Sequence, residues 1–228
     1  MENGSAGSGL EDNARAVIQR AFGCDEALSE TIASAARIGR LSRGQQLWPL
    51  DDRDETTLLT AGRVHEVAYG RDGSMLVLHM VGPGEFFGNL MGAASGEGAA
   101  QVEAVVDSAG AHFTTGTIVR LMETHHVVAM AISRQMAARI EAMRRRMVES
   151  ALLSATGRIA AELLRLGRDA PDRTIRPMPV FAELAVTVQS TRETVSRTIS
   201  QWEKRGLVKR VDGGLALVAP HRLEELVY

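Results

Sequence analysis

The chain has 228 residues, which is long enough for two modest domains with separate hydrophobic cores. Its formal net charge of -2 argues against a nucleic-acid partner unless the charge is unevenly distributed. The single cysteine, Cys24, excludes an intramolecular disulfide and a four-thiolate iron–sulfur cluster.

The N-terminal region, residues 1–24, is expected to be a tail followed by the start of a helix. Residues 1–9 are small and polar, and we expect them to be disordered. From Asn13 to Ala36 the apolar residues recur at helical spacing. The start lacks the features of a secretory signal and no apolar run approaches the roughly 20 residues of a membrane span. We therefore expect a cytoplasmic protein.

Residues 25–117 have the pattern of a β domain. Aspartate and glycine turn signals, such as Asp72-Gly73 and Gly82-Pro83-Gly84, interrupt short apolar segments. The segments are Thr57–Leu59, Val64–Ala68, Met75–Met80 and Gln101–Val106. Short apolar segments separated by turn residues are typical of antiparallel strands, so we predict an antiparallel β-roll or jelly roll within an α+β protein.

Residues 118–153 predict a long helix between two domains. Its apolar side chains recur at spacings of three and four, which places them along one face. They are Ile132, Met136, Ile140, Met143 and Met147. Such a stripe could be buried within one subunit or pair with the same stripe of a second copy. Because the run is long and lies between domains, we favour a parallel, coiled-coil-like dimer helix.

Residues 154–228 predict two helices in close contact after a first helix over Thr156–Leu166 and a proline-containing loop. A short helix over residues 181–188 precedes a longer one over Arg192–Lys204. The longer helix begins with the capping hydroxyl of Ser190 or Thr191. Val195, Ile199 and Trp202 form its buried face, on which Leu184 and Val188 of the short helix can pack.

A hairpin follows these helices. The apolar segments on either side of Asp212-Gly213-Gly214 read as two strands joined by a tight turn. Helix, turn, helix and hairpin together predict a winged helix-turn-helix. From Ser154 to Tyr228 there are 12 lysines and arginines against 9 aspartates and glutamates, so this region is the more basic part of the chain.

The exposed face of the longer helix carries Arg192, Glu193, Ser196 and Arg197. An arginine fork matches O6 and N7 of guanine, and a carboxylate can accept from N4 of cytosine, which suits base reading in the major groove. An ordinary solvated helix face is the alternative for the arginines alone. The preceding helix and the following hairpin favour DNA binding.

The segment Thr-Arg-Glu-Thr-Val-Ser-Arg at 191–197, with the Gly-Leu-Val that follows at 206–208, resembles the Crp/Fnr family of bacterial transcription regulators. The resemblance implies base reading by Arg192, Glu193 and Arg197. We expect Thr191, Ser196 and Lys204 to contact phosphates. One departure is Gln189, which occupies a turn position where the family usually has glycine. If that turn is left-handed, the substitution costs on the order of 1 kcal/mol.

The segment Gly82 to Leu90 resembles the ligand cassette of the same family, in which a carboxylate holds a ribose hydroxyl and an arginine holds the cyclic phosphate. Aligned by position, asparagine stands in place of the glutamate and two alanines stand in place of the Arg-Ser pair. The aligned effector pocket comprises Phe86, Gly88, Asn89, Leu90, Ala99, Ala100, Met143 and Arg144. Loss of the charged contact costs about 2 to 5 kcal/mol, so we predict no binding of cyclic AMP in the usual way.

Three alternatives remain for this sensor: a ligand-independent scaffold, another effector or haem. We predict no cofactor and no metal site, because no histidine spacing indicates a ligand set. Six histidines leave haem conceivable, with Cys24 or His79 as the iron ligand, and Arg144 could pair with an anionic or larger nucleotide. The histidines are His65, His79, His112, His125, His126 and His221.

The leading hypothesis is a homodimeric transcription regulator that binds double-stranded DNA. Two reading helices on a dimer would enter major grooves roughly 34 Å apart, which requires inverted half-sites. RNA polymerase is a candidate partner of such a regulator. A sensor or interaction module, whose helix-turn-helix contacts protein, is the second hypothesis. An enzyme is the weakest, because the sequence holds no phosphate loop, metal-spaced cluster or nucleophile with its base.

Overall fold

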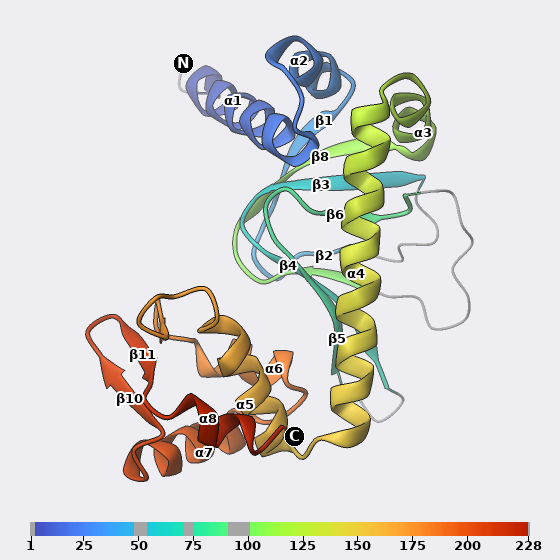
Figure 1. Ribbon diagram of the computed structural model, residues 1–228. Helices are drawn as coiled ribbons and strands as arrows, with labels where there is room; N and C mark the ends of the chain where they lie inside the picture. Colours follow the sequence, from blue (N-terminus) through green and yellow to red (C-terminus); the bar gives the residue numbers. More distant parts are fainter. Residues whose placement is uncertain (1–2, 48–53, 71–74, 91–100, 228) are drawn as a thin grey trace. The chain divides into compact units, whose positions relative to one another are not determined.

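The computed structural model describes residues 3–47, 54–70, 75–90 and 101–227 (Figure 1). They form two compact units, Met1–Ile140 and Glu141–Tyr228, so the boundary falls within a helix. The fold class is α+β, as predicted, with antiparallel sheets in the first unit and a winged helix-turn-helix in the second.

Two helices open the first unit, α1 (Asn3–Phe22) and α2 (Glu26–Ser34). Helix α1 begins at Asn3, within the segment that we expected to be disordered. Buried Ala14, Val17, Ile18 and Phe22 anchor α1, and its polar first turns continue the same helix. The helical region predicted from Asn13 to Ala36 is interrupted at Gly23, whose φ of +62° ends α1.

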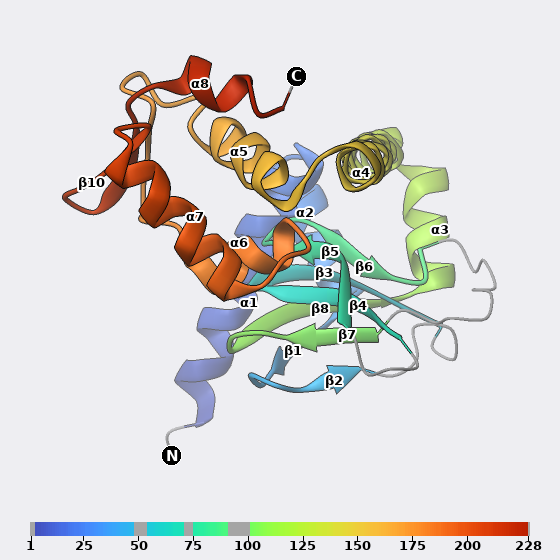
Figure 2. The same ribbon diagram turned by 90° about the horizontal axis from the view of Figure 1, so that it is seen from below.

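Two four-stranded antiparallel sheets follow, shown from two directions in Figures 1 and 2. One has the order β1-β8-β3-β6, formed by β1 (Arg37–Leu41), β8 (Ser108–Thr114), β3 (Glu55–Ala61) and β6 (Phe86–Gly88). The other has the order β2-β7-β4-β5, formed by β2 (Gln46–Leu47), β7 (Gln101–Ala104), β4 (Val64–Tyr69) and β5 (Met75–Val81). The four predicted strands correspond to β3, β4, β5 and β7, which confirms the β-roll.

The first unit contains two hydrophobic cores, because side chains alternate between the two faces of each strand. Leu58 and Phe86 belong to a cluster that includes residues of α1, α2, α3 and α4, whereas Leu59 and Phe87 belong to a cluster made by the two sheets. Neighbouring side chains of one strand point to opposite faces, so β3 and β6 contribute to both clusters. The N-terminal helices therefore cover one face of the roll.

The helix predicted over residues 118–153 is two helices, α3 (Thr115–Thr124) and α4 (His126–Leu152). The break is at His125, which has extended backbone angles. In α4 Ile132 is buried in the roll core and Met136 packs against it. Further along the same stripe Ile140, Met143 and Met147 are 66, 50 and 69% exposed. The apolar stripe therefore has a buried beginning and an exposed remainder in the single chain.

The second unit contains the end of α4 and then four elements before the wing: α5 (Ala155–Leu166), β9 (Thr174–Ile175), α6 (Phe181–Thr187) and α7 (Arg192–Lys204). The wing consists of β10 (Val208–Val211) and β11 (Gly214–Leu217), and α8 (Pro220–Glu224) follows it. The short strand β9 and helix α8 were not predicted. The sheet has the order β10-β11-β9.

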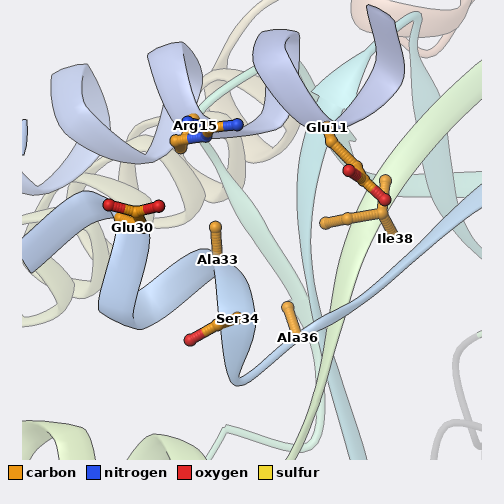
Figure 3. Close-up of a pocket in the computed structure, with 7 residues that line it drawn as sticks. All are labelled: Glu11, Arg15, Glu30, Ala33, Ser34, Ala36 and Ile38. Atoms are coloured by element: carbon orange, nitrogen blue, oxygen red, sulfur yellow. The ribbon is translucent and has the colours of Figure 1, made fainter. Parts of the chain in front are cut away.

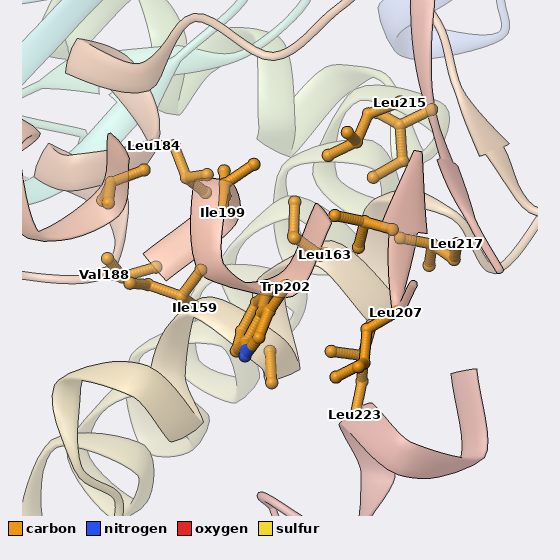
Figure 4. Close-up of a cluster of buried hydrophobic side chains, with 14 of the residues drawn as sticks. Ile159, Leu163, Leu184, Val188, Ile199, Trp202, Leu207, Leu215, Leu217 and Leu223 are labelled. Carbon is orange, nitrogen blue, oxygen red and sulfur yellow. The ribbon is translucent and has the colours of Figure 1, made fainter. Parts of the chain in front are cut away.

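Apolar side chains from most of these elements form one core (Figure 4). Val195, Ile199 and Trp202 of α7 pack there with Leu184 and Val188, as the spacing predicted. Ala185 is buried where α6 and α7 meet, which permits a close helix crossing. This core fixes the buried side of α7 and leaves its opposite side at the surface.

Candidate DNA-reading surface and effector region

The first turn of α7 is fixed by a hydroxyl cap. Thr191 has extended backbone angles, and its Oγ1 accepts a hydrogen bond from the amide of Thr194 at 3.1 Å. A threonine at this position satisfies one of the free amides of the helix start. The same Oγ1 lies 3.0 Å from the hydroxyl of Thr194, so its predicted phosphate contact has to coexist with these bonds.

The exposed side of α7 brings together the predicted reading residues. Arg192, Glu193, Arg197 and Lys204 are exposed and Ser196 is half-buried. None of the ion pairs among the described residues engages Arg192, Glu193 or Arg197. Their charged ends are therefore available to an incoming ligand.

Two polar residues that were not predicted, Ser200 and Gln201, lie on the same face of α7. They follow Ser196 and Arg197 by four residues, and Gln201 is exposed. The helical period places them in line with the reading residues, so the signal was present in the sequence. They extend the hydrogen-bonding face by another helical turn.

The turn between α6 and α7 has the left-handed conformation anticipated for Gln189. Its φ is +50°, which costs a non-glycine residue on the order of 1 kcal/mol. Carbonyl oxygens of this turn are bound by a side chain from α5: Arg158 donates through Nε to Val188 O at 2.8 Å and through Nη2 to Gln189 O at 3.1 Å. The glycine departure is thus accommodated by tertiary hydrogen bonds.

The wing contributes further positive charge. Lys209 and Arg210 of β10 are exposed. Arg210 lies 5.8 Å from the ring centre of Phe181 and 3.4 Å from a carboxylate oxygen of Glu203 on α7. These contacts connect the wing to both helices, while Lys209 stays at the surface.

The segment aligned with the ligand cassette, Gly82 to Leu90, contains β6 and the two residues after it. Gly88 has a φ of +100°, and a Cβ there would lie 2.6 Å from Glu55 O, so glycine is required. The carbonyl of Asn89 accepts hydrogen bonds from Thr56 Oγ1 at 2.7 Å and Thr115 Oγ1 at 2.8 Å. Phe86 and Leu90 are buried in the core beside α1 and α4. Ala99 and Ala100 lie outside the described residues.

A buried ion pair joins β4 to α4. Glu66 pairs with Arg139, and the two side chains are 3 and 24% exposed. Burial raises the pKa of the Glu66 carboxyl, and Arg139 opposes that rise. One helical turn earlier, Gln135 Nε2 donates to Gly84 O at 2.8 Å. Neither contact was predicted, because only the folded chain brings these residues together.

The two residues predicted to complete the effector pocket from α4 lie on its exposed part. Met143 is 50% exposed, and Arg144 pairs with Glu141 on the same helix at 2.7 Å. In the single chain Arg144 is thus engaged by a neighbouring carboxylate.

A surface cavity of about 380 Å³ lies where α1, α2 and β1 meet (Figure 3). It shares no residue with the predicted effector pocket; its lining is Glu11, Arg15, Glu30, Ala33, Ser34, Ala36 and Ile38.

Within the described ranges no group of three or more His, Cys, Asp or Glu side chains is placed to hold a metal. Burial raises the pKa of the Cys24 thiol. None of the helices in those ranges has the length and hydropathy needed to cross a membrane.

Comparison with known proteins agrees with this geometry. Residues 157–226 match the Crp-like helix-turn-helix domain family. The cAMP-activated global transcriptional regulator Vfr of Pseudomonas aeruginosa is 30% identical over 168 residues, which cover 69% of this chain and 78% of Vfr. The cAMP-activated global transcriptional regulator CRP of Salmonella typhimurium is 28% identical over 156 residues, which cover 66% of this chain and 74% of CRP.

Solved structures show the same fold. A CooA variant from Carboxydothermus hydrogenoformans matches with a TM-score of 0.77 at 17% identity, covering 92% of this chain and 95% of CooA. The c-di-GMP responsive global regulator CLP of Xanthomonas campestris matches with a TM-score of 0.67 at 22% identity, covering 85% of this chain and 99% of CLP.

A β-roll, a long helix and a winged helix-turn-helix with an exposed polar reading face define a DNA-binding transcription regulator. The sequence relatives, whose matches cover 69% and 66% of this chain, narrow this class further. The chain belongs to the Crp/Fnr family of transcription regulators.

Proposed function

We propose that the chain works as a homodimer that binds inverted-repeat DNA through α7 and is not controlled by cyclic AMP. The observation that carries the DNA-binding part is the exposed face of α7, where Arg192, Glu193 and Arg197 are in no ion pair among the described residues. Arg192, Glu193 and Arg197 read G·C pairs, and Thr191, Ser196 and Lys204 contact phosphates.

Each region of the chain is assigned one function. Residues 154–228 form the DNA-binding domain, residues 118–153 contain the dimerisation helix and residues 25–117 form an effector-like roll after the N-terminal residues 1–24. The hydroxyl cap at Thr191 and the core beneath α7 support this assignment, because they hold the reading face in one orientation.

The exposed remainder of the α4 stripe supports dimerisation. Met136, Ile140, Met143 and Met147 are spaced by four, three and four residues, which is the a/d spacing of a coiled coil. The last three are at least half exposed in the single chain. Pairing with a second copy buries them, and it presents two reading helices to one DNA site.

The chemistry of the roll supports independence from cyclic AMP, although the Vfr and CRP relatives are cAMP-activated. An asparagine, which carries no charge, replaces the family's carboxylate at position 89. At the positions aligned with the family's Arg-Ser pair the chain has Ala99 and Ala100, so these positions supply no cation for a cyclic phosphate.

Selection of bound sequences from a random duplex pool tests the DNA-binding part, performed with the full chain and with and without cyclic AMP. The expected result is an inverted repeat with G·C pairs in each half-site, enriched equally in both arms. Calorimetry provides the second readout, with no cyclic AMP binding at micromolar concentration. Enrichment that requires cyclic AMP would contradict the proposed independence, and absence of any enriched motif would contradict DNA reading.

A further inference from the structure

We propose that Arg158 is a positioning residue for the reading helix, because it joins the end of α4 to the turn that precedes α7. The proposal rests on the DNA-reading function proposed above. Arg158 Nη1 donates to Leu153 O, the residue after α4, at 2.9 Å. Its Nε and Nη2 donate to Val188 O at 2.8 Å and Gln189 O at 3.1 Å. One half-buried side chain therefore binds both segments.

The chemistry of this contact requires arginine. The guanidinium group is planar and rigid, and it directs several donors to fixed positions, whereas a lysine ammonium is a single flexible centre. Three carbonyl oxygens accept from Arg158, and none of the ion pairs in the described part of the chain includes it. Its charge is thus used for carbonyl contacts that connect separate segments.

Gln189 adds a second link between the same two regions. Its Oε1 accepts a hydrogen bond from Ser150 Oγ, in the last turns of α4, at 3.0 Å. Gln189 has a φ of +50°, a conformation that favours glycine, yet glycine has no side chain to reach Ser150. The residue that is less suited to the turn is the one that can contact α4.

An ion pair connects α4 to α5 beside these contacts. Glu149 lies 2.8 Å from Arg165, which also pairs with Glu162 on its own helix. The last turns of α4 are therefore fastened to α5 by Glu149 and to the turn before α7 by Ser150 and Arg158. A change in the direction of the end of α4 is transmitted to α7 through these contacts.

The decisive variant is Arg158→Lys, which keeps the charge and removes the fork. Its affinity is measured for a duplex with two selected half-sites and for a duplex with one. A positioning role predicts a loss of at least tenfold on two half-sites and less than threefold on one, because only the former needs both reading helices placed correctly. Arg168→Lys is the control, since Arg168 follows α5 and is exposed.

Gln189→Gly separates positioning from folding. Relief of the left-handed backbone maintains or raises the thermal unfolding midpoint, while loss of the Ser150 contact lowers affinity for two half-sites. Equal losses on both duplexes, or unchanged affinity in Arg158→Lys, would overturn the proposal. If the parent protein binds no DNA, the proposed function fails separately. Hydrogen exchange then decides the link: faster exchange of the amides around Gln189 in Arg158→Lys supports it, and unchanged exchange refutes it.

Discussion

Replacement of Arg139 by methionine is expected to destabilise the roll in a pH-dependent manner. Methionine keeps an apolar stem but removes the partner of the buried Glu66 carboxylate, which is 3% exposed. Removal of one partner from a buried pair costs about 3 to 5 kcal/mol. Because Arg139 itself is 24% exposed, water reaches the site and we expect the lower end, about 3 kcal/mol, at pH 8.

The direction with pH follows from the pKa of Glu66. Burial raises this pKa in the folded protein, and Arg139 partly offsets the rise, so the variant has a still higher pKa. The folded carboxyl then holds its proton more tightly than the unfolded one. Stability therefore falls as pH rises from the ordinary pKa to the raised pKa, and it recovers as pH is lowered through that interval.

The assay is urea-induced unfolding of the full chain at pH 5, 6.5 and 8, with hydrogen exchange of β4 amides identifying the transition of the roll. Protein concentration is held constant because association shifts apparent stability. Arg144→Met is the matched control on the same helix, since the Arg144–Glu141 pair is exposed and its loss changes little at any pH. An equal loss at all three pH values, or a loss below about 1 kcal/mol at pH 8, would refute the reasoning.

Two further predictions concern α7 and α4. Thr191→Ala removes the hydroxyl that caps α7 and is expected to lower the free energy of unfolding by about 1 kcal/mol. Thr191→Ser keeps a capping hydroxyl and is expected to retain most of that free energy. An unchanged urea midpoint in the alanine variant would contradict the capping role. Met143→Glu places like charges at the proposed seam and is expected to convert dimers to monomers in sedimentation equilibrium. Met130→Glu is its control, because Met130 is 49% exposed but lies on another side of α4, and dissociation by both variants equally would argue against the seam.

Local signals made the helix α7 predictable. Its cap, its start and the burial of Val195, Ile199 and Trp202 depend on neighbours within a few residues, and periodicity records those relations directly. The Asp212-Gly213 turn specified the hairpin in the same manner. The left-handed turn at Gln189 was anticipated from a family resemblance rather than from the local pattern.

Elements with a weak local pattern were missed. Strand β8 alternates, but it does so largely with alanine, glycine and serine, which are weak strand formers, and its burial on both faces is seen only in the folded protein. The first turns of α1 are polar and extend a helix that is anchored later by Ala14 and Ile18. The length of such elements is decided by tertiary packing rather than by their own sequence.

The contacts that distinguish this chain join residues distant in sequence. Glu66 and Arg139 are 73 positions apart, and Arg158 is 30 positions from Val188. Neither pair stands out among the many charged residues of the chain, because only folding brings the partners together. The sequence could identify the exposed polar face of α7, but it could not show how that face is held or how the roll contacts α4.

The most direct test of DNA reading by α7 is a comparison of the parent chain with Arg197→Ala on the selected duplex and on duplexes with each G·C pair replaced. Fluorescence anisotropy over a range of salt concentrations measures the affinities. The parent is expected to bind the selected site with an affinity that falls steeply with salt, and Arg197→Ala to lose about 1 to 3 kcal/mol there while no longer discriminating at one base pair. An equal loss by Arg197→Ala on every duplex, with base preference intact, would contradict the role of α7 as the reader.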